Sequence, residues 1–356
     1  MHIPLPASDL GTFLLAVLAL GILIVVHEGG HYMVARWSGM RVDRFSIGLG
    51  PKVIGFRHGE TDFQIGCIPF GGFVQIAGLN PGEEGIAPDD PRSYPNRPPY
   101  QRLATIFAGP ATNYVFAALV MVASCFVWGV PEQGSQPLVG GFVKGKPAET
   151  SGLVPGDEIV GVDGHAIADI KDVPALISAT QGREFKMDVL REGKPMSYAV
   201  TAAKDGSEYR LGIQLDTKDI RVHKGVGETL AFGVGFPIRY SGFILDGFAK
   251  IFSGKQKAEF SGPLGILTVM KKQIEHGPRF ALEIMAIISV YLGLFNLLPI
   301  PALDGSRMVF IGYEMVARRR VSENTEQRIH GYGMMVLLAF MLIVTFGKDI
   351  PKLFGH

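Results

Sequence analysis

The residues best suited to chemistry lie near the start of the chain, in the sequence His27-Glu28-Gly29-Gly30-His31. Two histidines four residues apart share one face of a helix and lie about 6 Å apart along its axis, which a single zinc ion can bridge. A carboxylate stands beside them, as the H-E-x-x-H pattern of zinc sites requires. The alternative is a chance match formed by ordinary polar residues on a surface helix.

The context of the motif favours a zinc site. The histidines follow directly on an uncharged apolar run from Gly11 to Val26. Ionisable side chains at the end of such a run are unfavourable in a lipid bilayer and are retained there for function. We therefore expect His27 and His31 to hold a metal ion at membrane depth, with Glu28 beside them.

A hydrolytic zinc site takes three protein ligands and leaves a fourth position for water. The best candidate for the third ligand is Asp304, which follows Pro299 and Pro301 in an apolar segment. Prolines break a helix, and non-helical backbone at membrane depth is tolerated only inside protein or beside a water-filled cavity. The alternative role for Asp304 is an N-cap of the helix that begins near Gly305, but the double-proline break favours the ligand.

The chain has 356 residues, of which 47% are hydrophobic, and its net charge of +1 implies no nucleic-acid partner. The apolar residues are concentrated in blocks, which predicts an α-helical multi-span membrane protein with about four transmembrane helices. We expect a first span within 1–37, a second at 103–130, a broken third at 280–317 and a fourth at 328–348.

Arginines and lysines concentrate between the first two spans and between the last two. The positive-inside rule places both of these loops in the cytoplasm, so that both termini face outward. The two histidines and Asp304 then meet only if the first and third spans cross in the same direction. We therefore expect segment 222–278 to lie on the outer surface as an amphipathic element that does not cross.

Residues 136–217 predict a soluble α+β domain between the second and third spans, with a helix at Asp172–Ala179 and a hairpin turn at Arg191–Lys194. The stretch Gly152–Gly164, which reads G-L-x-x-G-D-x-I-x-x-V-x-G, resembles the signature of PDZ domains. Such domains add a peptide strand to a sheet edge and receive its carboxylate on backbone N–H groups. In the circularly permuted bacterial form of the PDZ domain, the loop that receives the carboxylate comes late in the domain sequence. The candidate for this loop is therefore Arg210, Leu211, Gly212 and Ile213. The alternative is a domain that only screens access.

Together, the H-E-x-x-H motif, the PDZ-like domain and the pattern N-x-x-P-x-P-x-L-D-G from Asn296 to Gly305 resemble the site-2 protease family of intramembrane zinc metalloproteases, most closely its bacterial sigma-E-regulating branch. Four further stretches carry the same likeness: Phe45–Pro51, Ile68–Val74, Gly109–Asn113 and Ser261–Ile266. One departure is clear, because the best-known members carry two tandem PDZ domains and this chain has one.

The resemblance implies that His27, His31 and Asp304 hold Zn²⁺ and that Glu28 is the general base. It also implies that 53–78, within a cytoplasmic loop at 38–102, forms a β-hairpin that dips into the membrane. The edge of this hairpin, at Gly71, Gly72 and Phe73, would hold an extended substrate strand. Asn296 and Asn113 are candidates to bond the substrate backbone or stabilise the oxyanion, with interhelical hydrogen bonding as the alternative.

The expected activity is cleavage of transmembrane segments of single-span membrane proteins, such as anti-sigma factors or remnant signal peptides. The expected partners are these substrates, the lipid bilayer and peptide C-termini at the PDZ domain. The expected location is a bacterial inner membrane, with both termini and the PDZ domain in the periplasm and the active site near the cytoplasmic side. The main alternative is a PDZ-based membrane adaptor with an inert or structural zinc site. A zinc transporter ranks last, because no chain of ligands crosses the spans.

Overall fold

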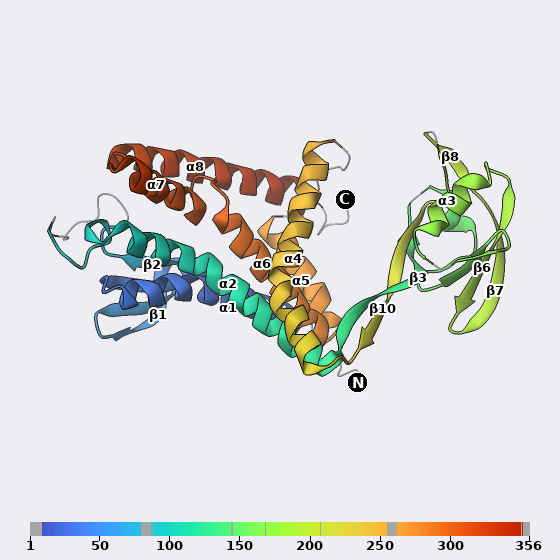
Figure 1. Ribbon diagram of the computed structural model, residues 1–356, viewed down its shortest axis with the longest axis horizontal. Coiled ribbons are helices and arrows are strands. Elements are labelled where there is room, and N and C mark those ends of the chain that lie inside the picture. Colours follow the sequence, from blue (N-terminus) through green and yellow to red (C-terminus); the bar gives the residue numbers. More distant parts are fainter. Residues whose placement is uncertain are drawn as a thin grey trace. The chain divides into compact units, whose positions relative to one another are not determined.

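The computed structural model describes residues 9–79, 87, 89–143, 145–167, 169–206, 208–254, 262–349 and 351. The chain divides into two units, Met1–Val127 with Gly225–His356, and Trp128–Lys224 (Figure 1). The first unit is mainly helical and the second is mainly β-sheet. The second unit is therefore an insertion between two halves of the first.

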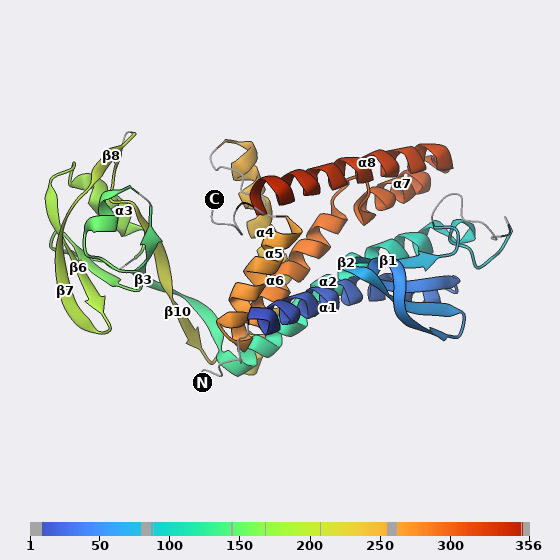
Figure 2. The ribbon, with the colours of Figure 1, turned by 180° about the vertical axis from the view of Figure 1, so that it is seen from behind.

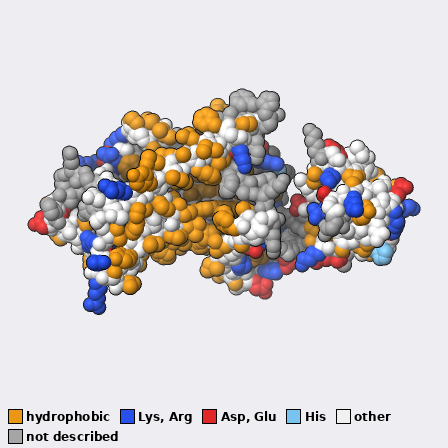
Figure 3. All heavy atoms as spheres, turned by 90° about the horizontal axis from the view of Figure 1, so that it is seen from above, with side chains coloured by type: hydrophobic (Ala, Val, Ile, Leu, Met, Phe, Trp, Pro, Cys, Tyr) orange, Lys and Arg blue, Asp and Glu red, His pale blue; other side chains and the backbone are white. Residues whose placement is uncertain are grey.

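Four helices in the described part of the chain are long and apolar enough to cross a membrane. They are α1 (Asp9–Trp37), α2 (Pro99–Trp128), α6 (Pro278–Leu297) and α8 (Glu323–Val344), the last running into a π-helical turn at Thr345–Asp349. Hydrophobic side chains cover most of the visible face of this helical unit (Figure 3). The expectation of a multi-span membrane protein is confirmed at this level, because such a surface is stable in lipid and not in water.

Glycines allow α1 and α2 to pack closely. A Cβ atom on Gly30 of α1 would overlap the carbonyl oxygen of Ala108, and one on Gly109 of α2 would overlap the His31 ring. Small residues at a helix contact let two backbones approach in a membrane, where packing drives helix association. The middle of α2 therefore lies directly against the second histidine of the motif.

The chain between α1 and α2 forms a folded β-hairpin of β1 (Val42–His58) and β2 (Thr61–Ile76), which lies beside α1 in both ribbon views (Figures 1 and 2). Phe45 of β1 lies opposite both Phe63 and Val74 of β2, so the start of β1 lies between the two ends of β2. The paired segment begins earlier than the expected 53–78 because the strands fold back and pair twice.

The second half of β1 exposes large apolar side chains. Val53, Ile54 and Phe56 are 68%, 63% and 66% exposed. Apolar strands exposed to water invite aggregation, whereas lipid solvates them favourably. This half of β1 is thus suited to a membrane environment.

The segment expected as a broken third span is two helices, α6 and α7 (Asp304–Ala317), joined by non-helical residues 298–303. Pro299 and Pro301 lack the backbone N–H that helix continuation needs, and each disfavours helical geometry in the residue before it. Ala302 has a positive φ of 75°, which a helix cannot accommodate. Asp304 therefore begins a new helix.

The segment expected as an amphipathic surface element contains α4 (Val226–Phe252) and α5 (Pro263–Glu275). α4 packs on α2 through Ser241, whose Oγ lies 2.7 Å from the Tyr114 hydroxyl, and on α6. It runs at an angle to α2 (Figure 1). Its length of 27 residues would suffice to cross a bilayer, but it is not among the helices apolar enough to do so.

The second unit is built on one antiparallel sheet in the strand order β10-β3-β4-β6-β7. Its elements are β3 (Val130–Phe142), β4 (Glu158–Val162), β5 (His165–Ala166), α3 (Asp172–Ala179), β6 (Glu184–Arg191), β7 (Lys194–Thr201), β8 (Ala203–Asp205), β9 (Glu208–Arg210) and β10 (Ile213–Val222). The expected helix and the expected hairpin turn are both present. Alternate residues such as Met187 and Val189 of β6 are fully buried in the core, as a half-buried strand requires.

The sheet extends beyond the expected bounds of 136–217. Val130 pairs with Val222 and Pro131 pairs with Arg221, so β3 and β10 continue as a two-stranded ribbon to the ends of the unit. The chain thus enters and leaves this unit through paired strands.

Candidate metal and active site

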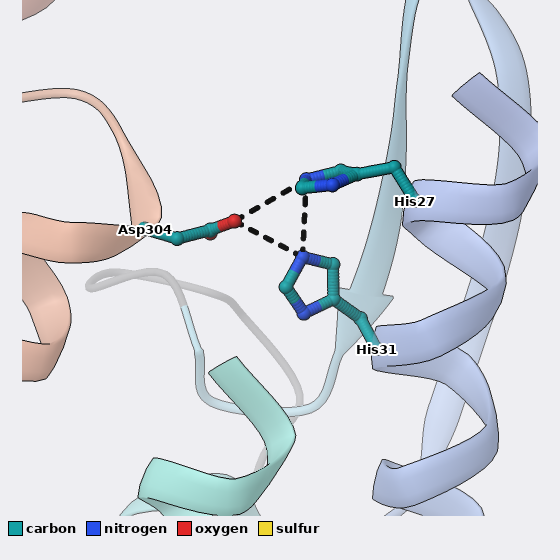
Figure 4. A group of neighbouring side chains, drawn as sticks. All are labelled: His27, His31 and Asp304. Carbon is teal, nitrogen blue, oxygen red and sulfur yellow. Dashed lines mark hydrogen bonds and ion pairs between the residues drawn. The ribbon is translucent and has the colours of Figure 1, made fainter. Parts of the chain in front are cut away.

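Two histidines and an aspartate from distant parts of the sequence converge at the helix break (Figure 4). His27 and His31 project from α1, and Asp304 projects from the first turn of α7. The Nε2 atoms of the two histidines each lie 3.2 Å from Asp304 Oδ2 and 3.4 Å from each other. In the described part of the chain, these three side chains are the group of metal-ligand type that lies close enough to share one ion.

The three atoms fit a zinc ion. In tetrahedral coordination with bonds of about 2.0–2.1 Å, neighbouring ligand atoms lie about 3.3 Å apart. The observed separations of 3.2, 3.2 and 3.4 Å match this value. Asp304 Oδ2 is also buried without a hydrogen-bond partner, which is unfavourable for a carboxylate unless a cation binds it. The donor set of two imidazoles and one carboxylate is typical of catalytic zinc.

Asp304 does not act as a helix cap. α7 begins at Asp304 itself, and the N-cap position is occupied by Leu303, with no side-chain capping bond. The alternative role considered from the sequence is therefore absent, and the carboxylate is directed toward the histidines (Figure 4).

Helix α2 contacts the Nδ1 atom of both imidazole rings, on the side of each ring away from Asp304. His31 Nδ1 lies 2.8 Å from the backbone carbonyl oxygen of Thr105, which can only accept a hydrogen bond. His31 Nδ1 therefore carries the proton, and the lone pair of Nε2 is directed toward Asp304. The Asn113 Nδ2 atom lies 3.0 Å from His27 Nδ1.

Glu28 lies in the same cavity as the three candidate ligands, a space of about 260 Å³. The backbone N–H of Val74, on the outer part of β2, donates to its carboxylate. Gly72 packs so closely on α1 that an added Cβ would lie 2.7 Å from Ile24 and 3.2 Å from Cγ of Glu28. The end of β2 is thus held against the carboxylate.

The candidate substrate-binding residues divide into two groups. Gly72, Phe73 and Asn296 line the cavity beside the metal ligands. Gly71 is not among the lining residues, and Asn113 is fully buried behind His27. Asn296 also donates to the Leu292 carbonyl oxygen at 3.0 Å within its own helix.

Two residues at the site were missed in the sequence. Arg307 lines the cavity, and its Nη1 donates to the Leu79 carbonyl oxygen at 3.0 Å. A signal was present, because Arg307 lies one turn after Asp304 and hence on the same helix face. Thr105 contributes through a backbone carbonyl, which no side-chain pattern reveals.

The candidate carboxylate loop of the second unit connects β9 to β10. Arg210 is exposed, whereas Leu211 is 2% exposed and belongs to the core. Gly212 has a positive φ of 82°, and Ile213 begins β10, an edge strand of the sheet. α3 packs against β9 next to this loop.

The H-E-x-x-H motif lies on an apolar helix long enough to cross a membrane. An aspartate that follows a second apolar helix meets its two histidines. This combination defines a membrane metalloprotease. The model of peptidase family M50 matches residues 15–341.

Curated proteins similar to this chain carry the name "Putative zinc metalloprotease". One from Fusobacterium nucleatum is 33% identical over 97% of this chain and 100% of its own length. Others from Brucella suis and Mesorhizobium japonicum are 31% and 32% identical, over 94% and 96% of this chain and 94% and 99% of their own lengths. The chain belongs to peptidase family M50, the site-2 protease family, and is a zinc metalloprotease.

Proposed function

We propose that this protein hydrolyses peptide bonds within or next to transmembrane segments of single-span membrane proteins. One observation carries the proposal: the triangle of His27, His31 and Asp304 joins the apolar helix α1 to the start of α7, seven residues after the apolar helix α6 ends at Leu297, with Glu28 in the same cavity. A protease whose candidate ligands lie on one apolar span and close after another is placed to act on substrates that lie in the same bilayer.

In the proposed reaction, Glu28 takes a proton from the attacking water and delivers it to the leaving amine. Zinc bound by His27, His31 and Asp304 would polarise the scissile carbonyl and lower the pKa of a water to about 7. The Val74 N–H orients the Glu28 carboxylate. Asn296 and Arg307 line the same cavity and are placed to bond the substrate backbone or the developing oxyanion.

The substrate must be extended, because the peptide bonds of an α-helix are covered by its own turns. Gly72–Ile76 pairs on one side with the start of β1 within the described strands, and Gly72, Phe73, Val74 and Ile76 line the cavity. We propose that the substrate adds to this strand as a further strand. Gly71 lies within β2 directly before this segment, and its positive φ of 89° marks a bend in the strand there.

We propose an inner-membrane location with both termini and the inserted unit in the periplasm. The contact between Asp304 and the histidines supports this topology, since it requires α1 and α6 to cross in the same direction. That condition holds if α2 crosses and the segment with α4 and α5 does not. The hairpin then dips into the membrane from the cytoplasmic side.

We propose that the second unit is a PDZ domain that binds peptide C-termini. β10 is an edge strand, and the loop Arg210–Ile213 precedes it beside α3. An open strand edge that begins at a glycine-containing loop is the arrangement that strand addition needs. Together with the single-span substrate class, it supports cleavage of anti-sigma factors already trimmed by another protease, or of remnant signal peptides.

The test is a reconstituted cleavage assay. The purified protein in proteoliposomes receives a model single-span substrate, with and without a zinc chelator. We expect cleavage inside the apolar segment, loss on chelation and recovery with added Zn²⁺. Binding of the substrate without cleavage, by a protein that carries stoichiometric zinc, would instead favour the PDZ-based adaptor.

A further inference from the structure

Asn113 is a polar side chain of α2 that contacts the candidate zinc ligand His27 and is not among the residues that line the cavity. It is 0% exposed, and the structure places its Nδ2 atom 3.0 Å from Nδ1 of His27. On its other side lies Ser289 of α6, whose Oγ is 3.5 Å from Asn113 Oδ1 and 2.9 Å from the Asn113 backbone carbonyl oxygen. A carboxamide has one accepting end and one donating end of nearly equal shape, so its orientation decides what it does to His27.

The orientation determines whether His27 can bind metal. If the NH₂ group faces Nδ1, then Nδ1 must accept and the proton resides on Nε2, the atom that points at Asp304. A protonated Nε2 cannot ligate zinc. If the carboxamide oxygen faces Nδ1, then Nδ1–H donates to it and the Nε2 lone pair is free.

Ser289 selects between these orientations. Its single hydroxyl hydrogen is committed to the Asn113 backbone carbonyl oxygen at 2.9 Å, the shorter of its two contacts. Toward the carboxamide its Oγ can then only accept a hydrogen bond. The NH₂ group satisfies it, whereas the amide oxygen would face it lone pair to lone pair. Turning NH₂ toward Ser289 turns the oxygen toward His27.

We propose that Asn113 is a positioning residue for the zinc ligand His27. In the zinc-loaded protein the carboxamide is turned end for end from the placement given above. Its oxygen then accepts the Nδ1–H bond of His27, which leaves Nε2 free to bind zinc, and its NH₂ group donates to Ser289 Oγ, which holds that orientation. The proposal rests on His27 being a zinc ligand. The Nδ1 atoms of both histidines then donate hydrogen bonds to α2, because His31 Nδ1 donates to the Thr105 carbonyl oxygen of the same helix.

The test measures zinc affinity by competition with a chelator, in purified full-length protein. N113L removes the acceptor, and we expect zinc affinity to fall by about 10–100-fold. N113D keeps an acceptor and loses the donor, and we expect affinity close to that of the parent. S289A removes only the orienting group and should fall between these two. Y114F is the matched control, since Tyr114 makes an interhelical bond to Ser241 from the next position of α2 and does not touch His27.

A second measurement needs no variant. In the zinc-loaded parent labelled with ¹⁵N-histidine, we expect the nitrogen spectrum to show His27 protonated at Nδ1 and metal-bound at Nε2. An unprotonated Nδ1 would overturn the proposal, as would parent-like affinity of N113L, or N113D as weak as a folded N113L.

The H27A variant distinguishes the assignment of His27 as a zinc ligand from the positioning role of Asn113. If H27A binds zinc like the parent, the ligand assignment itself fails. If H27A loses zinc and N113L keeps it, only the role of Asn113 fails.

Discussion

Glu28 is the residue to which we assign a chemical rather than a structural role. Its carboxylate lies in the cavity with the three candidate ligands and accepts a hydrogen bond from the Val74 backbone N–H. Glu28 is not part of the triangle of candidate ligand atoms. A residue in this position can carry a proton without holding the metal. The identity of this side chain should therefore affect the rate of cleavage and leave zinc binding intact.

The E28Q variant tests this separation. Gln has the same shape but cannot accept and release the proton, so we expect cleavage to fall by about 10²–10⁴-fold, the range typical of lost acid–base catalysis. Elemental analysis should show one zinc per chain, as in the parent. Residual activity near the parental level would remove Glu28 from the mechanism, and lost zinc would make it a ligand.

The role that we propose for Asp304 is the opposite one, to hold the metal, because its Oδ2 is one corner of the triangle. D304A should lose stoichiometric zinc as well as cleavage, since two histidines alone leave the site one ligand short. D246A is a suitable control, because Asp246 forms an exposed ion pair with Lys250 within α4, and its loss should change neither zinc content nor activity. Equal zinc content in D304A and D246A would exclude Asp304 as a ligand.

At the scale of elements, the site depends on how closely α1 and α2 approach. Gly29 and Gly30 stand side by side within the metal-binding motif, yet their surroundings differ. A Cβ on Gly29 would meet nothing within 4 Å, whereas one on Gly30 would overlap the backbone of α2 at Ala108. A backbone atom cannot rotate away as a flexible side chain can.

G30A and G29A form a matched pair that isolates this contact. G30A should lower stability by about 1–3 kcal/mol, as overpacking does, and reduce zinc affinity by shifting His31 from the triangle. G29A should retain zinc and gain up to about 1 kcal/mol from helix propensity. Thermal unfolding in detergent and chelator competition measure both effects. Indistinguishable variants would mean that helix spacing does not control the ligands.

The second unit has its own stabilising pair. Asp157 is fully buried and accepts two bonds of 2.7 Å from Arg191, which hold the pKa of its carboxyl below the usual value. Because the folded pKa lies below the unfolded value of about 3.9, the stabilisation is complete above that pH and is lost as the pH falls through the folded pKa. It contributes no pH dependence near neutrality.

D157N should therefore lower the urea midpoint of this unit at pH 7 and flatten its acid dependence. Pulse proteolysis of the full-length protein, scored for cuts between Trp128 and Lys224, measures this. K146A is the control, since the Lys146–Asp205 pair is partly exposed and contributes little. An acid dependence unchanged by D157N would assign it to other groups.

The sequence predicted which three side chains meet at the candidate metal site because each part is a local pattern: an i, i+4 histidine pair at the end of an apolar run, and a carboxylate after two prolines. The number and placement of the apolar helices followed for the same reason. The double pairing of β1 did not, because it depends on contacts such as Phe45 with Tyr32 of α1. The position of Asn113 also could not be derived, since an amide in an apolar helix carries no sign of which neighbour it faces.

At the scale of the whole molecule, the ligands constrain how the chain crosses the membrane. His27 and His31 lie toward the end of α1, and Asp304 follows the end of α6. They meet only if α1 and α6 cross in the same direction. With α2 crossing between them, any further crossing by α4 would carry Asp304 to the other side.

The length of α4 does not determine whether this helix crosses the membrane. Its 27 residues exceed what a bilayer requires, and it exposes large apolar side chains such as Val234, Ile238 and Phe243. It also carries Glu228, Arg239, Asp246 and Lys250, which keep it outside the group of helices apolar enough to cross. An amphipathic helix that lies at the interface accommodates both properties.

A reporter inserted after Gly254, directly past α4, tests this topology. A phosphatase that is active only outside the cytoplasm should be active at this position, and a fluorescent protein that matures only inside should be dark. The same reporters after Arg319, between α7 and α8, should give the opposite result, because the positive-inside rule predicts a cytoplasmic position for a turn with arginines at 318–320. A cytoplasmic signal at Gly254 would mean that α4 crosses. Asp304 could then not share an ion with the histidines, and the zinc site would need a different third ligand.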